Sequence, residues 1–438
     1  MEKRKTKNDY SFLASPFGLV LLLTFFTFLL VINNNLSNES GWISAFSKSF
    51  EFWQSGFFSL LAFTMQMMMV LVFGYALAIF QPIHAFLSRW AQIPSSLPKA
   101  SLLVAGLTMG AGLLNWGFGL VLGAIFSKMV HEALLKKGIP SRLELLAACG
   151  YLSSSVWHGG LSGSALLAIA ESGHVLEDSI GIIPASQTIF SSLNLMISGG
   201  LVFLFLILAF FLAKVSKGTL ETIPGRNLES ISRGHQNPLA WIAGILLVSS
   251  FALGIISGQF QGLSSISLNW VIFLLFALVL LAYRSWEKFN LAVSRGLGSA
   301  LDIFIQFPFY GGIMGLITAS GLLMEISLWT SSLSGARTLA AFTFVSAAIV
   351  NFFVPSGGGQ WAIQGPLIME SARFLDVGFN KMALVFAYGD EISNLLQPFW
   401  ALPLLSITGV SVKKLLPYCL VFFVFGFAYL FAMIWFIV

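Results

Sequence analysis

The stretch Asn351-Phe-Phe-Val-Pro-Ser-Gly-Gly-Gly-Gln-Trp361 interrupts a hydrophobic segment that runs from residue 336 to residue 372. Three consecutive glycines permit a sharp turn, and a proline ends a helix without needing a hydrogen-bond donor of its own. Unpaired backbone groups are costly in hydrocarbon, so such a break must be packed inside protein or line a water-filled cavity. The segment is therefore predicted to be a helical hairpin that enters and leaves the membrane on one side.

The composition of the 438-residue chain indicates that the rest of it also lies in a membrane. Hydrophobic residues make up 57% of the chain and charged residues only 9%, which is more apolar surface than one soluble core can bury. A helix needs about 20 mainly apolar residues to cross a bilayer. Such spans are predicted at residues 16–32, 52–80, 143–170, 187–213, 239–257, 268–283, 300–325, 380–408 and 412–438.

A second interrupted hydrophobic segment, 99–130, is also predicted to be a re-entrant hairpin, and the basic residues support this choice. Counting either hairpin as a single span would reverse the side of every later loop. With the N-terminus inside, the cytoplasmic loops hold all but four of the 23 basic residues; the exceptions are Lys48, Arg337, Arg373 and Lys381. The predicted fold class is an all-α polytopic membrane protein with about nine transmembrane helices and two re-entrant hairpins.

The two halves of the chain repeat one plan, in which a broken hairpin is followed by a broken helix. Asn115 and Gly150 mark the two breaks of the first half, 35 positions apart, and Asn351 and Gly389 mark those of the second, 38 positions apart. The extra helix at 239–257 between the halves predicts that the second copy is inverted. The predicted divisions are a first repeat at 1–213, with hairpin 99–130 and broken helix 143–170; a cytoplasmic linker and extra helix at 214–267; and a second repeat at 268–438, with hairpin 336–372 and broken helix 380–408.

The four breaks are predicted to meet and to bind a small anion near the middle of the bilayer. The N-terminal ends of half-helices carry a partial positive charge that attracts a carboxylate. Glycines, uncharged hydrogen-bonding residues and aromatic residues suited to a short alkyl chain surround the breaks. The predicted substrate-binding residues are Asn115, Trp116, Gly117, Ser153, Ser154, Ser155, His158, Gly159, Ser162, Ser356, Gly357, Gly358, Gly359, Gln360, Trp361, Gln364, Ser393 and Asn394.

Two carboxylates in the second broken helix, Asp390 and Glu391, are predicted to bind the coupling ion, because charged side chains at membrane depth are costly and mark ion pathways. His158 in the first broken helix could move a proton or donate to a carboxylate. No certain metal site and no cofactor are predicted, and the coupling ion is left open between proton and sodium. A sodium ion would be expected near Asn115, Ser155, Asn351 and Asn394.

Each of these features also has a structural interpretation. Serine and glycine allow close helix packing, tryptophans anchor helices at the membrane interface, and a buried histidine can be an interhelical hydrogen-bond partner. Asp390 or Glu391 could instead cap a half-helix or pair with a base such as Arg373. Cys149 and Cys419 lie far apart in apolar segments, so no disulfide framework is indicated. The sequence lacks a phosphate-binding GxxxxGK[ST] motif, and its basic residues fit membrane topology rather than nucleic-acid binding.

Three motifs resemble the bacterial short-chain fatty acid transporter family: Val354-Pro-Ser-Gly-Gly-Gly-Gln-Trp-Ala-Ile-Gln-Gly-Pro366, Trp157-His-Gly-Gly-Leu-Ser-Gly-Ser164 and Gly389-Asp-Glu-Ile-Ser-Asn394. The resemblance covers nearly the whole chain and extends to a superfamily of inverted-repeat carboxylate carriers. It implies a homodimer in the bacterial inner membrane, with a scaffold domain and a transport domain that carries both hairpins. It also implies short-chain monocarboxylates such as acetoacetate or butyrate as cargo. The chain departs from the superfamily's paired Ser-Asn-Thr sodium motifs.

Ion-coupled symport of a short-chain monocarboxylate is therefore the expected function. A sodium-coupled dicarboxylate or other small-anion carrier is the alternative, although it would favour more fixed positive charge at the breaks than the sequence supplies. A channel would not need two opposed hairpins. An intramembrane enzyme would need a nucleophile and base at catalytic spacing, which the sequence does not show. The chain is expected not to be an enzyme.

Overall fold

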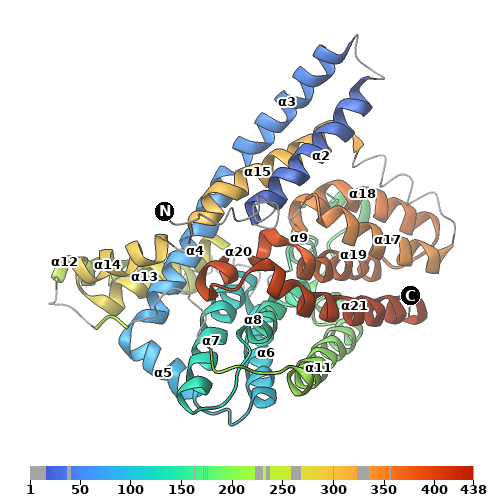
Figure 1. The fold of residues 1–438 in the computed structure, drawn as a ribbon. Coiled ribbons are helices and arrows are strands. Elements are labelled where there is room, and N and C mark those ends of the chain that lie inside the picture. Colours follow the sequence, from blue (N-terminus) through green and yellow to red (C-terminus); the bar gives the residue numbers. More distant parts are fainter. Residues whose placement is uncertain are drawn as a thin grey trace, which may run out of the picture.

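The computed structural model is almost entirely helical (Figure 1). It describes residues 16–36, 41–161, 163–170, 172, 174, 176–221, 230–232, 237–257, 268–298, 300–322, 335–354 and 357–437. Within these ranges the β-type pairing is limited to isolated bridges, Phe80 with Ile231 and Ser141 with Thr219. The predicted all-helical class is confirmed.

The helices follow the predicted order closely. In the first half they are α2 (Pro16–Leu36), α3 (Trp42–Ser59), α4 (Leu61–Ile79), α5 (Gln81–Ala91), α6 (Leu97–Leu114), α7 (Trp116–Lys136), α8 (Leu143–Tyr151), η1 (Leu152–Ser155), η2 (Trp157–Gly159), α9 (Ser164–Ala168), α10 (Glu177–Ile180), η3 (Ala185–Gln187) and α11 (Ser192–Val215). In the second half they are α12 (Pro238–Ile256), α13 (Leu268–Tyr283), α14 (Trp286–Leu297), α15 (Leu301–Ala319), α17 (Ala336–Asn351), α18 (Gly357–Phe374), α19 (Phe379–Ser393), η5 (Asn394–Leu396), α20 (Pro398–Thr408) and α21 (Val412–Ile437).

Many of these helices are suited to a bilayer. In the part of the chain that the structure describes, five helical segments are long and apolar enough to cross one: Trp42–Ile79, Leu97–Leu114, Trp116–Lys136, Ser192–Val215 and Val412–Phe436. Five shorter apolar helices accompany them, at Val20–Asn35, Pro238–Gly254, Asn269–Tyr283, Ile303–Ala319 and Ala336–Asn351. These helices make the chain a multi-pass membrane protein.

The largest departure from the predicted spans concerns the second one, expected to begin at residue 52. Helix α3 begins at Trp42 and continues almost without interruption into α4, giving a 38-residue segment. At about 1.5 Å per residue it is roughly 57 Å long, well beyond the ~30 Å of a hydrocarbon core. Its polar first turns stay helical because α2 and α15 pack against α3; Asn35 of α2 donates to the Ser49 hydroxyl at 3.1 Å.

Helices α2, α3 and α15 lie side by side as an arm that projects from the rest of the molecule (Figure 1). Glycines allow α3 and α15 to approach closely: a Cβ on Gly56 would lie 2.3 Å from the Gly311 carbonyl oxygen. Helices α12, α13 and α14 pack together beside α4. The hairpins α6–α7 and α17–α18 and the broken helices after them gather in the remaining body, with α11 and α21 beside them.

Each predicted hairpin segment contains two helices, α6 with α7 and α17 with α18, and α7 differs in its surroundings from α11 and α21. In the central apolar window of α7, 72% of the residues are buried, against 28% in α11 and in α21. Helix α7 therefore lies within the protein, whereas α11 and α21 present most of their surface outward, where lipid would cover it.

Two amphipathic helices, α5 and α14, were not predicted, and neither was the short helix α10. Helix α14 buries Phe289, Ala292 and Gly296, which recur at the three- and four-residue spacing of one helix face, while Trp286 on it is exposed. Both helices are too short and too polar to register as spans. Amphipathic helices of this kind lie along a membrane surface or against a neighbouring helix.

Candidate functional site

The four helix breaks meet in the body of the molecule. The hairpin break at Asn115 lies beside η1 and η2, because Leu161 donates its backbone N–H to the Leu113 carbonyl at 2.7 Å. Asn115 itself begins α7, since its Oδ1 accepts the Phe118 N–H at 3.0 Å. Segment η1 contacts η5 of the second broken helix. The predicted convergence of the breaks is thus seen in the structure.

Serine hydroxyls explain why the first broken helix tightens at residues 152–155. The Oγ–H groups of Ser153, Ser154 and Ser155 donate to carbonyls three residues back, at 3.3, 2.7 and 2.9 Å. Such bonds compete with regular helix geometry and favour short 3₁₀ turns. All three hydroxyl groups are buried and direct their hydrogens at their own helix. Only their oxygen lone pairs are left to face a ligand.

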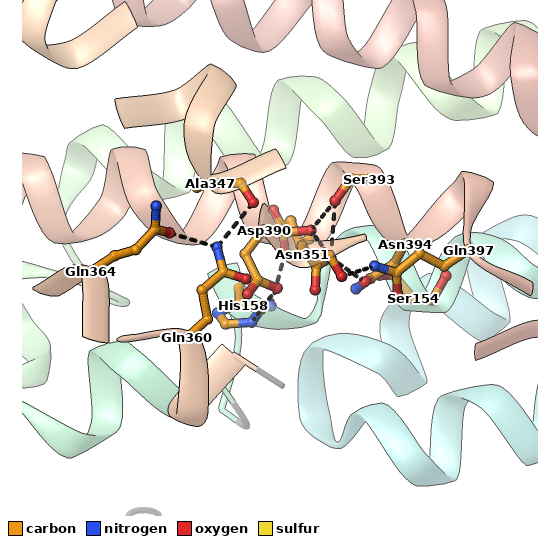
Figure 2. A network of polar contacts seen from close by, with 11 residues as sticks. Ser154, His158, Ala347, Asn351, Gln360, Gln364, Asp390, Ser393, Asn394 and Gln397 are labelled. Carbon is orange, nitrogen blue, oxygen red and sulfur yellow. Dashed lines mark hydrogen bonds and ion pairs between the residues drawn. The ribbon is translucent and has the colours of Figure 1, made fainter. Parts of the chain in front are cut away.

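Asn351, at the end of α17, connects the second hairpin to the second broken helix (Figure 2). Its Nδ2 lies 2.7 Å from the Asp390 carbonyl oxygen, 2.9 Å from the Ser393 hydroxyl and 2.8 Å from Asn394 Oδ1. An amide nitrogen has two hydrogens, so three acceptors must share them. Asn394 in turn donates to the Ser154 carbonyl at 3.0 Å, which joins the two halves of the chain.

Three buried ionisable residues, His158, Asp390 and Glu391, form a cluster. His158 Nε2 lies 3.2 Å from Asp390 Oδ1, and the side chains are 0% and 1% exposed. The neighbouring Glu391 accepts the His158 backbone N–H at 2.9 Å through Oε2. Among the described residues, His158 Nδ1, Asp390 Oδ2 and Glu391 Oε1 have no hydrogen-bond partner. Two carboxylates and one imidazole without full compensation can exchange a proton or hold a cation.

The start of α18 lies against this cluster. A Cβ built on Gly357 would lie 2.6 Å from both Cε1 and Nε2 of His158, so only glycine lets the helix begin there. Gln360, one turn further on, is fully buried and donates to the Ala347 carbonyl at 2.9 Å and to Gln364 Oε1 at 2.8 Å (Figure 2). Its own Oε1 has no partner among the described residues. The partial positive charge of this helix end therefore points at buried polar groups.

The predicted aromatic residues lie at two different places. Trp116 packs against Trp157, with ring centroids 6.0 Å apart, and against Trp400 at 5.1 Å. Trp157 also lies 3.8 Å from the His158 ring. Trp361 instead packs on Phe386 at 5.0 Å. The first group is positioned to cover one side of the ionisable cluster.

The remaining predicted residues are placed as follows. Gly117 packs beside Val70, Gly159 against Ser198, Gly358 near Ser164, and Gly359 borders a groove described below. Ser162 and Ser356 lie outside the described residues. Of the residues named for sodium, Asn351 and Asn394 are in contact, whereas no hydrogen bond in the described part of the chain links Asn115 or Ser155 to them. The described residues contain no cluster of three or more His, Cys, Asp or Glu side chains that could hold a metal ion.

Sequence reasoning missed five buried polar residues that support the site. Tyr388 and Ser198 donate to Asn194 Oδ1, and Asn194 donates to the Gly159 carbonyl at 2.9 Å, which fixes the turn after His158. Tyr151 donates to the Asn394 and Gln397 carbonyls, and Gln397 donates to the Asn351 carbonyl. Single uncharged polar residues within apolar spans give little signal; their only mark was polarity at membrane depth.

Buried helix ends that surround an ionisable cluster, within a multi-pass helical fold, define a class of protein: membrane transporters. In such proteins discontinuous helices present their ends and polar groups to cargo and ions. The sequence profile described as "Short chain fatty acid transporter" matches residues 1–437. The chain therefore belongs to the short-chain fatty acid transporter family.

Individual relatives agree with this assignment. The chain is 31% identical over 424 residues to an Escherichia coli K12 protein named as a short-chain fatty acid transporter, covering 93% of this chain and 92% of that protein. It is 32% identical over 435 residues to a Haemophilus influenzae protein of the same name, covering 94% of each. Two solved structures are similar. Neisseria gonorrhoeae MtrF, described among antimetabolite efflux pumps, is 15% identical with a TM-score of 0.44, and the match covers 97% of this chain and 95% of MtrF. The Alcanivorax borkumensis YdaH transporter is 13% identical with a TM-score of 0.49, and the match covers 95% of this chain and 98% of YdaH.

Proposed function

We propose that the chain is a secondary active transporter that moves short-chain monocarboxylates, such as acetoacetate and butyrate, by ion-coupled symport with alternating access. The observation that carries this proposal is the contact between the start of α18 and the buried His158–Asp390–Glu391 cluster. A helix N-terminus attracts the cargo carboxylate, while the adjacent Asp390 and Glu391 carboxylates, which lack full compensation, bind the coupling ion. Binding of each then depends on the other, as symport requires.

The division of the chain supports alternating access. We propose that 1–213 and 268–438 are inverted repeats, with residues 214–267 between them, and that both hairpins are re-entrant. In both proposed repeats, two hairpin helices are followed by a broken helix and then by a long final helix. In the first repeat these are α6 and α7, then α8 to α9, then α11; in the second they are α17 and α18, then α19 to α20, then α21. An inverted pair of this kind can open one site to each side of the membrane in turn. A bacterial inner membrane, a cytoplasmic N-terminus and a homodimer complete the proposal.

Uptake by purified protein in proteoliposomes tests the function. Labelled butyrate and acetoacetate should accumulate when an inward proton or sodium gradient is imposed, and the two gradients are varied separately to name the ion. Monocarboxylates should be preferred, because Asp390 and Glu391 lie where a second cargo carboxylate would be repelled. Absence of accumulation under either gradient, from protein that remains folded, would overturn the proposal.

Replacing Gly357 by alanine is expected to lower butyrate uptake about tenfold or more while the protein stays folded. The added Cβ would lie 2.6 Å from the His158 ring and 3.0 Å from the Ser164 hydroxyl, so the start of α18 or His158 must move. Gly358→Ala is the matched control, because its Cβ would meet nothing closer than Ser164 Cβ at 3.7 Å. Equal uptake by the two variants would contradict the proposed role of this contact.

A further inference from the structure

A groove of 510 Å³ lies outside the His158–Asp390 cluster, between the arm and the tip of the second hairpin. Helices α3 and α15 form one wall, and Val354 and Gly359 of the hairpin form the other. A water molecule occupies about 30 Å³ in the liquid, so the groove can hold a small acid together with several waters.

One face of α3 lines the groove with polar side chains. Glu51, Ser55 and Ser59 are spaced four residues apart, which places them in one stripe along the helix, and all three are exposed. Exposed Thr318 of α15 adds another hydroxyl to the same lining. In helices that lie in a membrane, polar and charged side chains face protein or a water-filled cavity rather than lipid. The groove is therefore a place for water and polar solutes.

The two walls of the groove differ in what they pack against. Helices α3 and α15 touch backbone to backbone, since a Cβ on Gly315 would lie 2.4 Å from the Phe52 carbonyl oxygen. The hairpin wall is the first turn of α18, whose Gly359 borders the groove while Gly357 touches His158 on the inner side. One helical turn thus separates the groove from the buried cluster.

We propose that this groove is the water-filled vestibule through which the monocarboxylate reaches the first turn of α18, and that Glu51 disfavours dicarboxylates there. The inference rests on the proposed function. Phe52, Met314 and Val354 supply apolar surface for a short alkyl chain. The Glu51 carboxylate raises the energy of a dianion about twice as much as that of a monoanion, so it discriminates by charge.

Cysteine labelling tests the vestibule, because native Cys149 and Cys419 are both buried. Ser55→Cys and Ser59→Cys proteins in proteoliposomes are treated with a sulfonate-bearing methanethiosulfonate applied to both sides. Modification is expected to lower butyrate uptake about tenfold, and butyrate should slow the labelling. Gln54→Cys is the control: Gln54 is exposed at the same level of α3 but does not line the groove.

The outcomes separate this inference from the proposed function. One outcome overturns the vestibule: unmodified Ser55→Cys protein takes up butyrate, and complete labelling leaves this uptake unchanged. Failure of both groove cysteines to react would also overturn it. In either case the proposed transport function stands. If the unmodified wild-type protein takes up nothing, the proposed function fails first.

Glu51→Gln should increase inhibition by succinate relative to inhibition by butyrate about fivefold. Glu287→Gln is the control, because Glu287 lies on α14 and is 85% exposed. An unchanged ratio would overturn the role of Glu51.

Discussion

Asp390→Asn is expected to abolish gradient-driven accumulation of butyrate, by about a hundredfold or more, while exchange of labelled for unlabelled butyrate is impaired much less. Asparagine keeps the size of aspartate but cannot gain or lose a proton and carries no charge for a cation. Asp390 Oδ1 is the group 3.2 Å from His158 Nε2, so the substitution also removes the carboxylate that faces the buried imidazole.

The comparison of accumulation with exchange separates coupling from simple loss of the fold. Both are measured in the same proteoliposomes, with Asp376→Asn as the matched control. Asp376 is exposed between α18 and α19, and its backbone φ of 53° suits asparagine as well as aspartate. Accumulation at the wild-type level by Asp390→Asn would show that the cluster does not bind the coupling ion.

The fold could be predicted in outline because bilayer physics leaves few options. A proline, a glycine run or a serine run within an apolar segment is tolerated only inside protein. The breaks at Asn115 and Asn351 therefore marked the hairpins, and those at Gly150 and Gly389 marked the broken helices. Span ends were accurate where a polar loop closes a helix, as at 268–283. The start of α3 was wrong by ten residues, because its polar turns are held by α2 and α15.

Parts of the site depended on contacts that no local pattern encodes. The repeat predicted that the breaks converge, and charge at membrane depth made Asp390 and Glu391 candidates for the coupling ion. The pairing of Asp390 with His158 joins residues 232 positions apart (390 minus 158), and spacing along the chain says nothing about it. The sequence also carried no sign that the Ser153–Ser155 hydroxyls donate their hydrogens to carbonyls of their own helix.

Asn351→Leu is expected to have the second-largest effect, lowering both stability and uptake. The Asn351 side chain is 1% exposed, and its amide supplies hydrogens to Asp390, Ser393 and Asn394. Leucine has a similar size but no donor, so buried Asn394 Oδ1 loses this partner, while the Asp390 carbonyl loses the amide and keeps the Ser393 hydroxyl at 2.9 Å. Each buried acceptor left unsatisfied costs about 1–3 kcal/mol, although hydrogen bonds within membranes average nearer ~0.6 kcal/mol.

These two free energies predict different stabilities for Asn351→Leu, and the thermal unfolding midpoint can decide between them. If the larger value holds, the thermal unfolding midpoint in detergent falls by several degrees, because about 1 kcal/mol shifts a midpoint by roughly 2–4 °C in larger domains. If the smaller value holds, the midpoint barely changes, yet uptake should still fall about tenfold, because the backbone that carries Asp390 is no longer fixed to α17. Asn380→Leu is the control, since it removes one exposed hydrogen bond to the Gln187 carbonyl. Wild-type uptake together with a wild-type midpoint would show that Asn351 does not position the cluster.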